Sequence, residues 1–232
     1  MNRLSRQGLC AMAPLGLLAF WGGLWMAGRR YPSEYDWRYM SISSLVYADR
    51  NPDGYRWAWG GLMLCALGGL CWTAVLIRHA KRDAAGRRPI GIWALGVGYA
   101  CMVCALVPQR LLRVPKGHEM LALAAFFGLC IGIVQLTFRA IEQSVWLRRR
   151  GFPRGPWIHA GLLAGAALLP ILLAGLAPAY VSSALPDLRW VGLEWRARGV
   201  PVYLSFTFWE WMTCVVFSVY LVGLCLATDK IT

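Results

Sequence analysis

The chain has 232 residues, of which 58% are hydrophobic and only 15% are charged. An ordinary soluble domain has roughly a quarter charged residues, and the apolar residues here lie in long uninterrupted runs. These features exclude a soluble globular protein and predict an all-α, polytopic membrane protein. The formal net charge of +13 is explained by basic clusters beside the apolar runs, so no nucleic-acid partner is expected.

Six apolar runs are long enough, or nearly so, to cross a hydrocarbon core of ~30 Å at about 1.5 Å per residue. In chain order they are residues 9–27, 58–77, 90–107, 120–138, 157–177 and 202–227. The first run is longer than the apolar part of a signal peptide and lacks a clear cleavage site, so we expect it to be retained. The short connections leave no room for a soluble domain. Residues 1–232 are therefore predicted to form a single domain, a bundle of six transmembrane helices.

Short basic clusters indicate how the helices are oriented. The clusters at residues 78–88 and 148–154 are compact, carry few acidic residues and lie beside predicted helix ends. Clusters of this kind remain in the cytoplasm, where they contact anionic lipid headgroups. We therefore expect both termini to be cytoplasmic and membrane lipids to be the partners of the chain.

The first connection on the extracytoplasmic side is rich in tyrosine and tryptophan between residues 31 and 59. A disordered linker would be poor in such residues, whereas aromatic side chains are favoured at the membrane interface. We expect an ordered extracytoplasmic cap on the helix ends. Within it, Asn51-Pro52-Asp53-Gly54 predicts a tight turn.

Small residues predict close helix packing in two places. Gly128-x3-Gly132 and Gly161-x3-Gly165 each place two glycines on one helix face, which lets a neighbouring backbone approach closely.

Glu210 is an ionisable residue inside the sixth apolar run. At that depth a carboxyl group is costly and usually faces the bundle interior or a wet cavity. Thr207, Cys214 and Ser218 share its helix face and form a polar stripe with it. Two interpretations remain open: Glu210 belongs to a functional site, or it only fixes the bundle through hydrogen bonds.

Other polar residues are predicted on the same extracytoplasmic side. His118 begins the fourth run, and Asp36, Ser43 and Ser44 lie in the cap. We hypothesise that Ser43, His118 and Glu210 converge beneath the cap to line one pocket, with Ser44 and Asp36 as further candidates. A purely structural role is the alternative for His118.

The connection that precedes His118 is basic. Arg110, Arg113 and Lys116 lie in it close to the predicted interface. Such cations can hold a lipid phosphate, which makes these three residues candidates for binding a headgroup. The alternative is that they are solvated interfacial charges.

Metal and disulfide chemistry is not expected. The eight cysteines fall in or at the ends of apolar runs, and Cys101-x2-Cys104 is at most half a metal site. A bilayer separates His118 from His79 and His159, whereas zinc ligands lie within ~2.0–2.1 Å of one ion. The predicted topology therefore excludes a three-histidine zinc site, and neither a metal nor another cofactor is expected.

Three short motifs carry a resemblance to a known family. They are Ile42-Ser43-Ser44 followed by Asn51-Pro52-Asp53-Gly54, His118-x3-Ala122-x3-Phe126, and Glu210-Trp211. Together with six spans, they resemble the Frag1/DRAM/Sfk1 family and a related bacterial family of six-span proteins. The resemblance extends over the layout of the whole chain. It implies a multi-pass protein linked to lipid handling, here in the bacterial inner (plasma) membrane.

A more distant similarity is to a superfamily of membrane hydrolases that includes alkaline ceramidases. Those proteins use a serine, an aspartate and three histidines around zinc. This chain has only three histidines, and the predicted topology places them on opposite sides of the membrane. The zinc chemistry of that superfamily is therefore not expected here.

Two classes of function remain open on this basis. The first is a non-catalytic membrane protein that binds or handles a lipid or similar amphiphile in an outward-facing polar pocket. The second is a membrane-embedded lipid hydrolase or lipid-remodelling enzyme. It would need Ser43 or Ser44, His118 and an acid such as Asp36 or Glu210.

Overall fold

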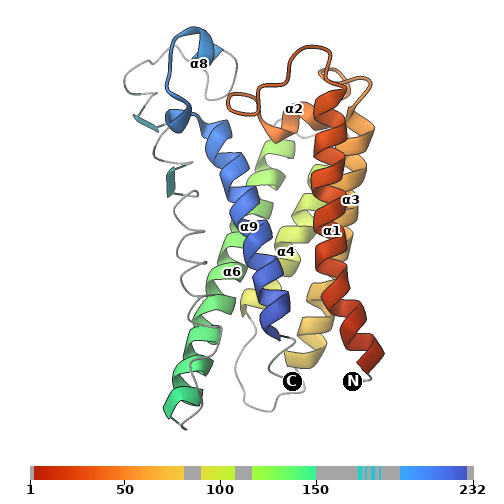
Figure 1. Ribbon diagram of the computed structural model, residues 1–232, viewed down its shortest axis with the longest axis vertical. Helices are drawn as coiled ribbons and strands as arrows, with labels where there is room; N and C mark the ends of the chain where they lie inside the picture. The colour runs from red at the N-terminus through yellow and green to blue at the C-terminus, as the bar shows by residue number, and fades with distance from the viewer. Residues whose placement is uncertain are drawn as a thin grey trace.

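A computed structural model describes residues 3–80, 90–107, 117–149 and 194–228, with a few residues between 172 and 183. In the described part of the chain the regular structure is helical and contains no strand. Five long helices lie side by side along the longest axis of the molecule (Figure 1). They are α1 (Arg3–Arg29), α3 (Tyr55–Ala80), α4 (Ile90–Ala105), α6 (Gly117–Arg149) and α9 (Phe206–Thr228).

Three short helices lie at one end of these long helices. α2 (Ile42–Val46) lies near the point where α1 ends and α3 begins, and α8 (Glu194–Ala197) and η1 (Val202–Leu204) precede α9 (Figure 1). We call this end of the molecule the α2 end. α1 begins and α9 finishes at the opposite end (Figure 1).

The long helices overlap five of the six predicted spans. The fifth predicted span, residues 157–177, falls almost entirely outside the described residues. The sixth span was predicted from residue 202, but the α-helix begins at Phe206 after the short η1 turn.

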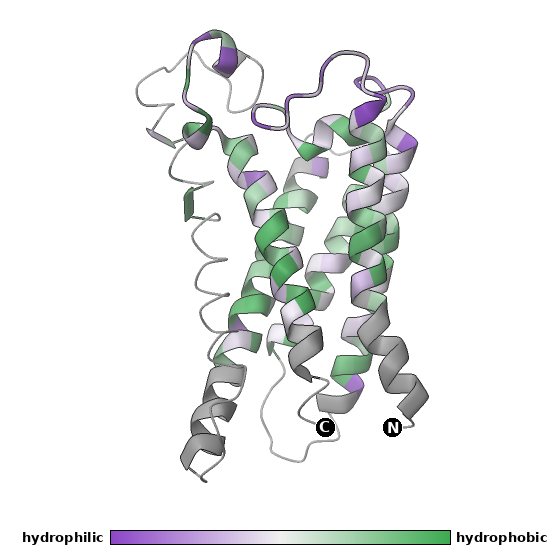
Figure 2. Ribbon diagram, viewed as in Figure 1, coloured by the Kyte–Doolittle hydropathy of each residue, from purple (hydrophilic) through white to green (hydrophobic). Residues whose placement is uncertain are grey.

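Within the described residues, three helices are long and apolar enough to cross a membrane. They contain the candidate spans Tyr55–Arg78, Met120–Phe138 and Phe206–Gly223, and α4 is a shorter apolar helix. Their outward faces are apolar, since Leu64 is 61% exposed and Phe138 is 63% exposed. Figure 2 shows hydrophobic residues along the middle of the helices and hydrophilic residues gathered at the α2 end. A soluble monomer rarely exposes such extensive apolar surface, so the chain is a membrane protein.

Glycines allow α4 and α6 to pack closely. A methyl group on Gly128 would lie 2.8 Å from the carbonyl oxygen of Ala94 and 2.8 Å from the Cα atom of Gly98. One on Gly132 would meet the side chain of Leu95. The predicted packing role of Gly128-x3-Gly132 is thereby confirmed, whereas Gly161-x3-Gly165 lies outside the described residues.

Buried polar contacts join α9 to the other helices. The Trp21 indole N–H donates to Ser218 Oγ at 3.0 Å, which links α1 to α9. The Tyr220 hydroxyl lies 2.6 Å from Thr137 Oγ1 and donates to the carbonyl oxygen of Ile133 at 3.3 Å, which links α9 to α6. Because hydrogen bonds are stronger in an apolar surrounding than in water, these contacts help to fix the position of α9.

Candidate functional site

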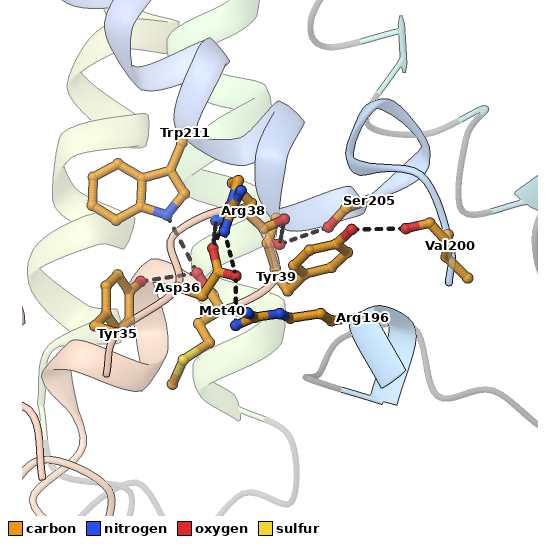
Figure 3. Close-up of polar contacts among 10 residues, drawn as sticks. Tyr35, Asp36, Arg38, Tyr39, Met40, Arg196, Val200, Ser205 and Trp211 are labelled. Carbon is orange, nitrogen blue, oxygen red and sulfur yellow. Dashed lines mark hydrogen bonds and ion pairs between the residues drawn. The ribbon is translucent and has the colours of Figure 1, made fainter. Parts of the chain in front are cut away.

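The segment between α1 and α2 is held by an ion-pair cluster (Figure 3). Asp36 is only 5% exposed, and its carboxylate accepts hydrogen bonds from Arg38 Nε at 2.7 Å and Arg38 Nη2 at 3.1 Å. Arg196 of α8 approaches the same carboxylate at 3.3 Å. Asp36 therefore joins the segment before α2 to the segment before α9.

Charge–charge contacts set the protonation state of this aspartate. Burial alone would raise the pKa of Asp36, but the hydrogen bonds and charge of Arg38, aided by Arg196, outweigh burial and lower the pKa below its usual value. Asp36 is therefore ionised at neutral pH, and its carboxylate is paired with Arg38 and Arg196.

The beginning of α9 also binds the segment before α2 (Figure 3). Thr207 Oγ1 donates to the Arg38 carbonyl oxygen at 2.9 Å, and Trp211 Nε1 donates to the Met40 carbonyl oxygen at 3.3 Å. The Tyr39 hydroxyl donates to the Val200 carbonyl oxygen at 2.8 Å. These contacts place α2 against α9 although the two lie far apart in the sequence.

Tyr35 adds a further constraint on this segment. Its hydroxyl group lies within hydrogen-bond distance of two carbonyl oxygens, those of Met40 at 2.9 Å and Ser41 at 3.0 Å, and can donate to either. Burial, followed by the nearby charge of Glu210, raises the pKa of Tyr35 well above its usual value of about 10. The hydroxyl therefore keeps its proton and remains a donor at physiological pH.

Asn51 is the buried polar residue at the centre of the turn predicted at residues 51–54. Its side chain is fully buried, donates to the carbonyl oxygens of Ala27 at 3.1 Å and Leu45 at 3.2 Å, and accepts from Gly54 N at 3.1 Å. Gly54 is required because a methyl group there would lie 2.7 Å from the Ala27 carbonyl oxygen. The turn therefore fastens α2 and the start of α3 to the end of α1.

A cavity of about 220 Å³ lies beneath α2. All five long helices and α2 contribute to its wall, and most of the lining side chains are apolar. Three of the polar lining residues are Ser43, His118 and Glu210. Ser43 is on α2 and His118 is in the first turn of α6, so polar groups line the cavity at the α2 end.

The opposite part of the cavity wall is apolar. Leu95, Ile133 and Leu221 line it and also belong to the buried cluster among α4, α6 and α9. The cavity is therefore amphipathic, with polar groups toward the α2 end and hydrocarbon side chains farther inside.

Glu210 lies in the second turn of α9 and is oriented toward α2. Its Oε2 atom accepts a hydrogen bond from the backbone N–H of Ile42 at 3.3 Å, the first residue of α2. Within the described part of the chain, no other hydrogen-bond donor reaches this carboxyl group. The contact supports a structural role in placing α2, and the remaining oxygen stays available to a ligand.

His118 has one ring nitrogen fixed by the protein. Nδ1 lies 2.8 Å from the carbonyl oxygen of Ala105, the last residue of α4. Because a carbonyl can only accept, Nδ1 carries the proton, and in the neutral ring Nε2 is an acceptor. Tyr47 packs against the ring edge to face at 5.1 Å. Among the described residues Nε2 has no partner.

The predicted pocket residues divide into two groups. The structure brings Ser43, His118 and Glu210 to one cavity. Asp36 lies in the ion-pair cluster instead, and Ser44 Oγ is 3.2 Å from Ser41 Oγ and 3.5 Å from an Arg50 guanidinium nitrogen. Neither Ser44 nor Asp36 is among the lining residues.

The polar stripe on α9 also divides. Cys214 and Ser218 line the cavity with Glu210, whereas Thr207 faces the segment before α2. Ala122 and Phe126 were noted only for their spacing after His118, and both line the cavity. The lining residues Tyr99, Met102 and Phe217 were missed, because inside an apolar run nothing marks a side chain that faces a cavity.

The headgroup candidates Arg110, Arg113 and Lys116 lie outside the described residues. Where the chain is described, no group of three or more histidine, cysteine, aspartate or glutamate residues is placed to hold a metal ion. The cavity can hold an apolar chain and offer hydrogen-bonding groups to a polar head.

The fold and the cavity define a helical membrane protein with an internal amphipathic cavity. Comparisons with known protein families, curated proteins and solved structures find no match to this chain.

Proposed function

We propose that this chain is a single-domain, six-span membrane protein whose outward-facing polar pocket binds or handles a lipid or similar amphiphile. The observation that carries the proposal is the cavity of about 220 Å³ with Ser43, His118 and Glu210 among its polar lining and hydrocarbon side chains deeper inside. Ligand pockets typically combine an apolar wall with a few placed polar groups. An amphiphile fits both parts of this wall.

The proposal includes the membrane topology. The segment from Tyr31 to Gly54 would be the extracytoplasmic cap, and its contacts with α1, α3 and α9 support that role. α6 ends away from the α2 end, whereas α8 lies at it (Figure 1), which supports a further crossing between them. Both termini would be cytoplasmic, as the basic clusters at residues 78–88 and 148–154 indicate. The membrane would be a bacterial inner membrane, which fits the resemblance to the Frag1/DRAM/Sfk1 family and its bacterial relatives.

A lipid hydrolase is the second candidate, because a serine, a histidine and a carboxyl group line one cavity. The geometry favours binding over catalysis. Ser43 Oγ lies 2.7 Å from Ser41 Oγ, and no described contact joins Ser43 to His118. An activated serine normally has its base within hydrogen-bond reach, although such bonds can tighten only when substrate is present.

The test is mass spectrometry of the lipid that copurifies with the full chain, beside the lipid profile of cells that lack the gene. We expect a stoichiometric bound amphiphile and an unchanged cellular profile. A lipid species that accumulates or disappears in the deletion strain would support the enzyme instead. Protein that is folded but carries no amphiphile would contradict the proposal.

A further inference from the structure

We infer that the cavity selects a single-chain amphiphile whose head donates hydrogen bonds, a hydroxyl or an amine, over one with an anionic phosphate head. The inference rests on the proposed function and adds the chemical class of the ligand. It follows from three properties of the cavity: the kind of polar groups available, the charge of its wall and its size.

The first property concerns Glu210 and His118, which each have a hydrogen-bonding atom without a described partner at the α2 end and can offer acceptors there. As a carboxylate, Glu210 has acceptor oxygens only, and one of its oxygens already receives the Ile42 N–H at 3.3 Å. In the neutral form of the His118 ring, the Nδ1 proton is used on the Ala105 carbonyl oxygen at 2.8 Å, which leaves Nε2 as an acceptor. A ligand that satisfies both groups must bring its own donors.

The deeper polar residues do not change this balance. Thr213 Oγ1 donates to the Trp209 carbonyl oxygen at 2.8 Å, and Ser218 Oγ donates to the Cys214 carbonyl oxygen at 2.7 Å. The protons of both hydroxyl groups are therefore used within α9. Ser43 Oγ is already within 2.7 Å of another serine hydroxyl.

The second property is charge. No lysine or arginine occurs among the described residues that line the cavity. A phosphate would therefore lie near the Glu210 carboxylate without a compensating cation, and like charges in a poorly solvated site repel each other. A hydroxyl or ammonium group meets no such penalty.

The third property is size. Pockets for drug-sized ligands occupy roughly 300–1,000 Å³, whereas an engineered cavity of about 150 Å³ holds benzene. At about 220 Å³, this cavity has room for part of one hydrocarbon chain and a small head. A lipid with two acyl chains does not fit inside it.

Photoactivatable decanol, decylamine and decyl phosphate, identical in the chain, test the inference on the full protein in phosphatidylcholine nanodiscs. Peptide mass spectrometry measures how much probe is attached to each residue. The readout is the amount on Phe126, which lines the cavity, divided by the amount on Phe127, which is 53% exposed. We expect this ratio to be higher for the alcohol and the amine than for the phosphate by on the order of tenfold or more.

Two variants tie the selectivity to the residues named. Glu210→Gln removes the charge of the carboxylate. The Phe126-to-Phe127 labelling ratio of the phosphate should then come closer to the ratios of the alcohol and the amine. His118→Asn keeps an amide donor for the Ala105 carbonyl oxygen but removes Nε2, so labelling by the alcohol should fall. Glu34→Gln is the matched control, because Glu34 is exposed and does not line the cavity.

The outcomes separate this inference from the proposed function. Enrichment of all three probes to the same degree, or preference for the phosphate, would overturn the inference while leaving amphiphile binding intact. A preference for the phosphate would point to Arg110, Arg113 and Lys116 as the groups that hold the head. Absence of cavity labelling by every probe would overturn both. The wild-type ratios decide the matter even if a variant fails to fold.

Discussion

At the residue scale, single side chains at the α2 end hold segments that the sequence separates widely. Asn51 binds the last turn of α1 and the carbonyl oxygen of Leu45 in α2. Asp36 binds Arg196, which lies 160 positions later in the chain. Since buried polar groups are costly when unpaired, both side chains should matter for stability although neither lines the cavity.

Replacing Asn51 by alanine should destabilise the protein. The change leaves the carbonyl oxygens of Ala27 and Leu45 and the N–H of Gly54 without this partner, at a cost of about 1–3 kcal/mol for each group that stays buried. Thermal unfolding in detergent measures the effect, with Asp53→Ala in the same turn as an exposed control. Equal melting temperatures for the two variants would contradict the role given to Asn51.

The Asp36 cluster predicts a particular pH dependence. Because the pKa of Asp36 is lowered in the folded protein, its stabilising contribution is present above the ordinary pKa of about 3.9 and is lost as pH falls through the lower, folded value. Asp36→Asn should therefore lower the melting temperature at pH 7, and the difference from wild type should shrink below about pH 4. A difference that is constant with pH would refute this linkage.

At the element scale, the apolar runs predicted the positions of the long helices well. A helix that crosses lipid must be apolar over most of its length, so its signal is local. The position of α2 is not a local property, because the Met40 carbonyl oxygen and the Ile42 N–H find partners on α9. The sequence indicated an ordered segment on the helix ends, but not which residues of α9 its backbone would contact.

The candidate site was predictable in part for the same reason. His118 and Glu210 are conspicuous because polar residues in apolar runs are rare, and both line the cavity. Asp36 is equally conspicuous, but its pairing with Arg196 depends on the tertiary fold. Only the structure shows that His118 and Glu210 line the cavity, whereas Asp36 joins two segments of the chain.

The close packing of α4 on α6 predicts the effect of a single methyl group. Gly128→Ala should lower the melting temperature because the added carbon would meet the Ala94 carbonyl oxygen and the backbone of Gly98. Gly60→Ala is the matched control, since a methyl group there has no neighbour within 4 Å, and it should be neutral or stabilising. A Gly128→Ala variant as stable as the Gly60→Ala variant would show that the helices are less tightly packed.

At the scale of the whole molecule, the proposed topology makes a direct prediction. Single cysteines at Arg82 and Arg149 should be protected from an impermeant thiol reagent in intact cells, and those at Asp53 and Arg113 should react. The background must lack the native cysteines. Labelling at Arg149, or protection at Asp53, would reverse the orientation and place the α2 end in the cytoplasm.

Filling the cavity tests the central claim, that it binds an amphiphile, most directly. Ala122 lines the cavity, whereas the adjacent Leu123 is 57% exposed and is not a lining residue. Native mass spectrometry would count the bound amphiphile in wild type, Ala122→Trp and Leu123→Trp, with melting temperatures to show that each is folded. We predict that Ala122→Trp loses the ligand while Leu123→Trp retains it. Full retention by a folded Ala122→Trp protein would contradict the claim.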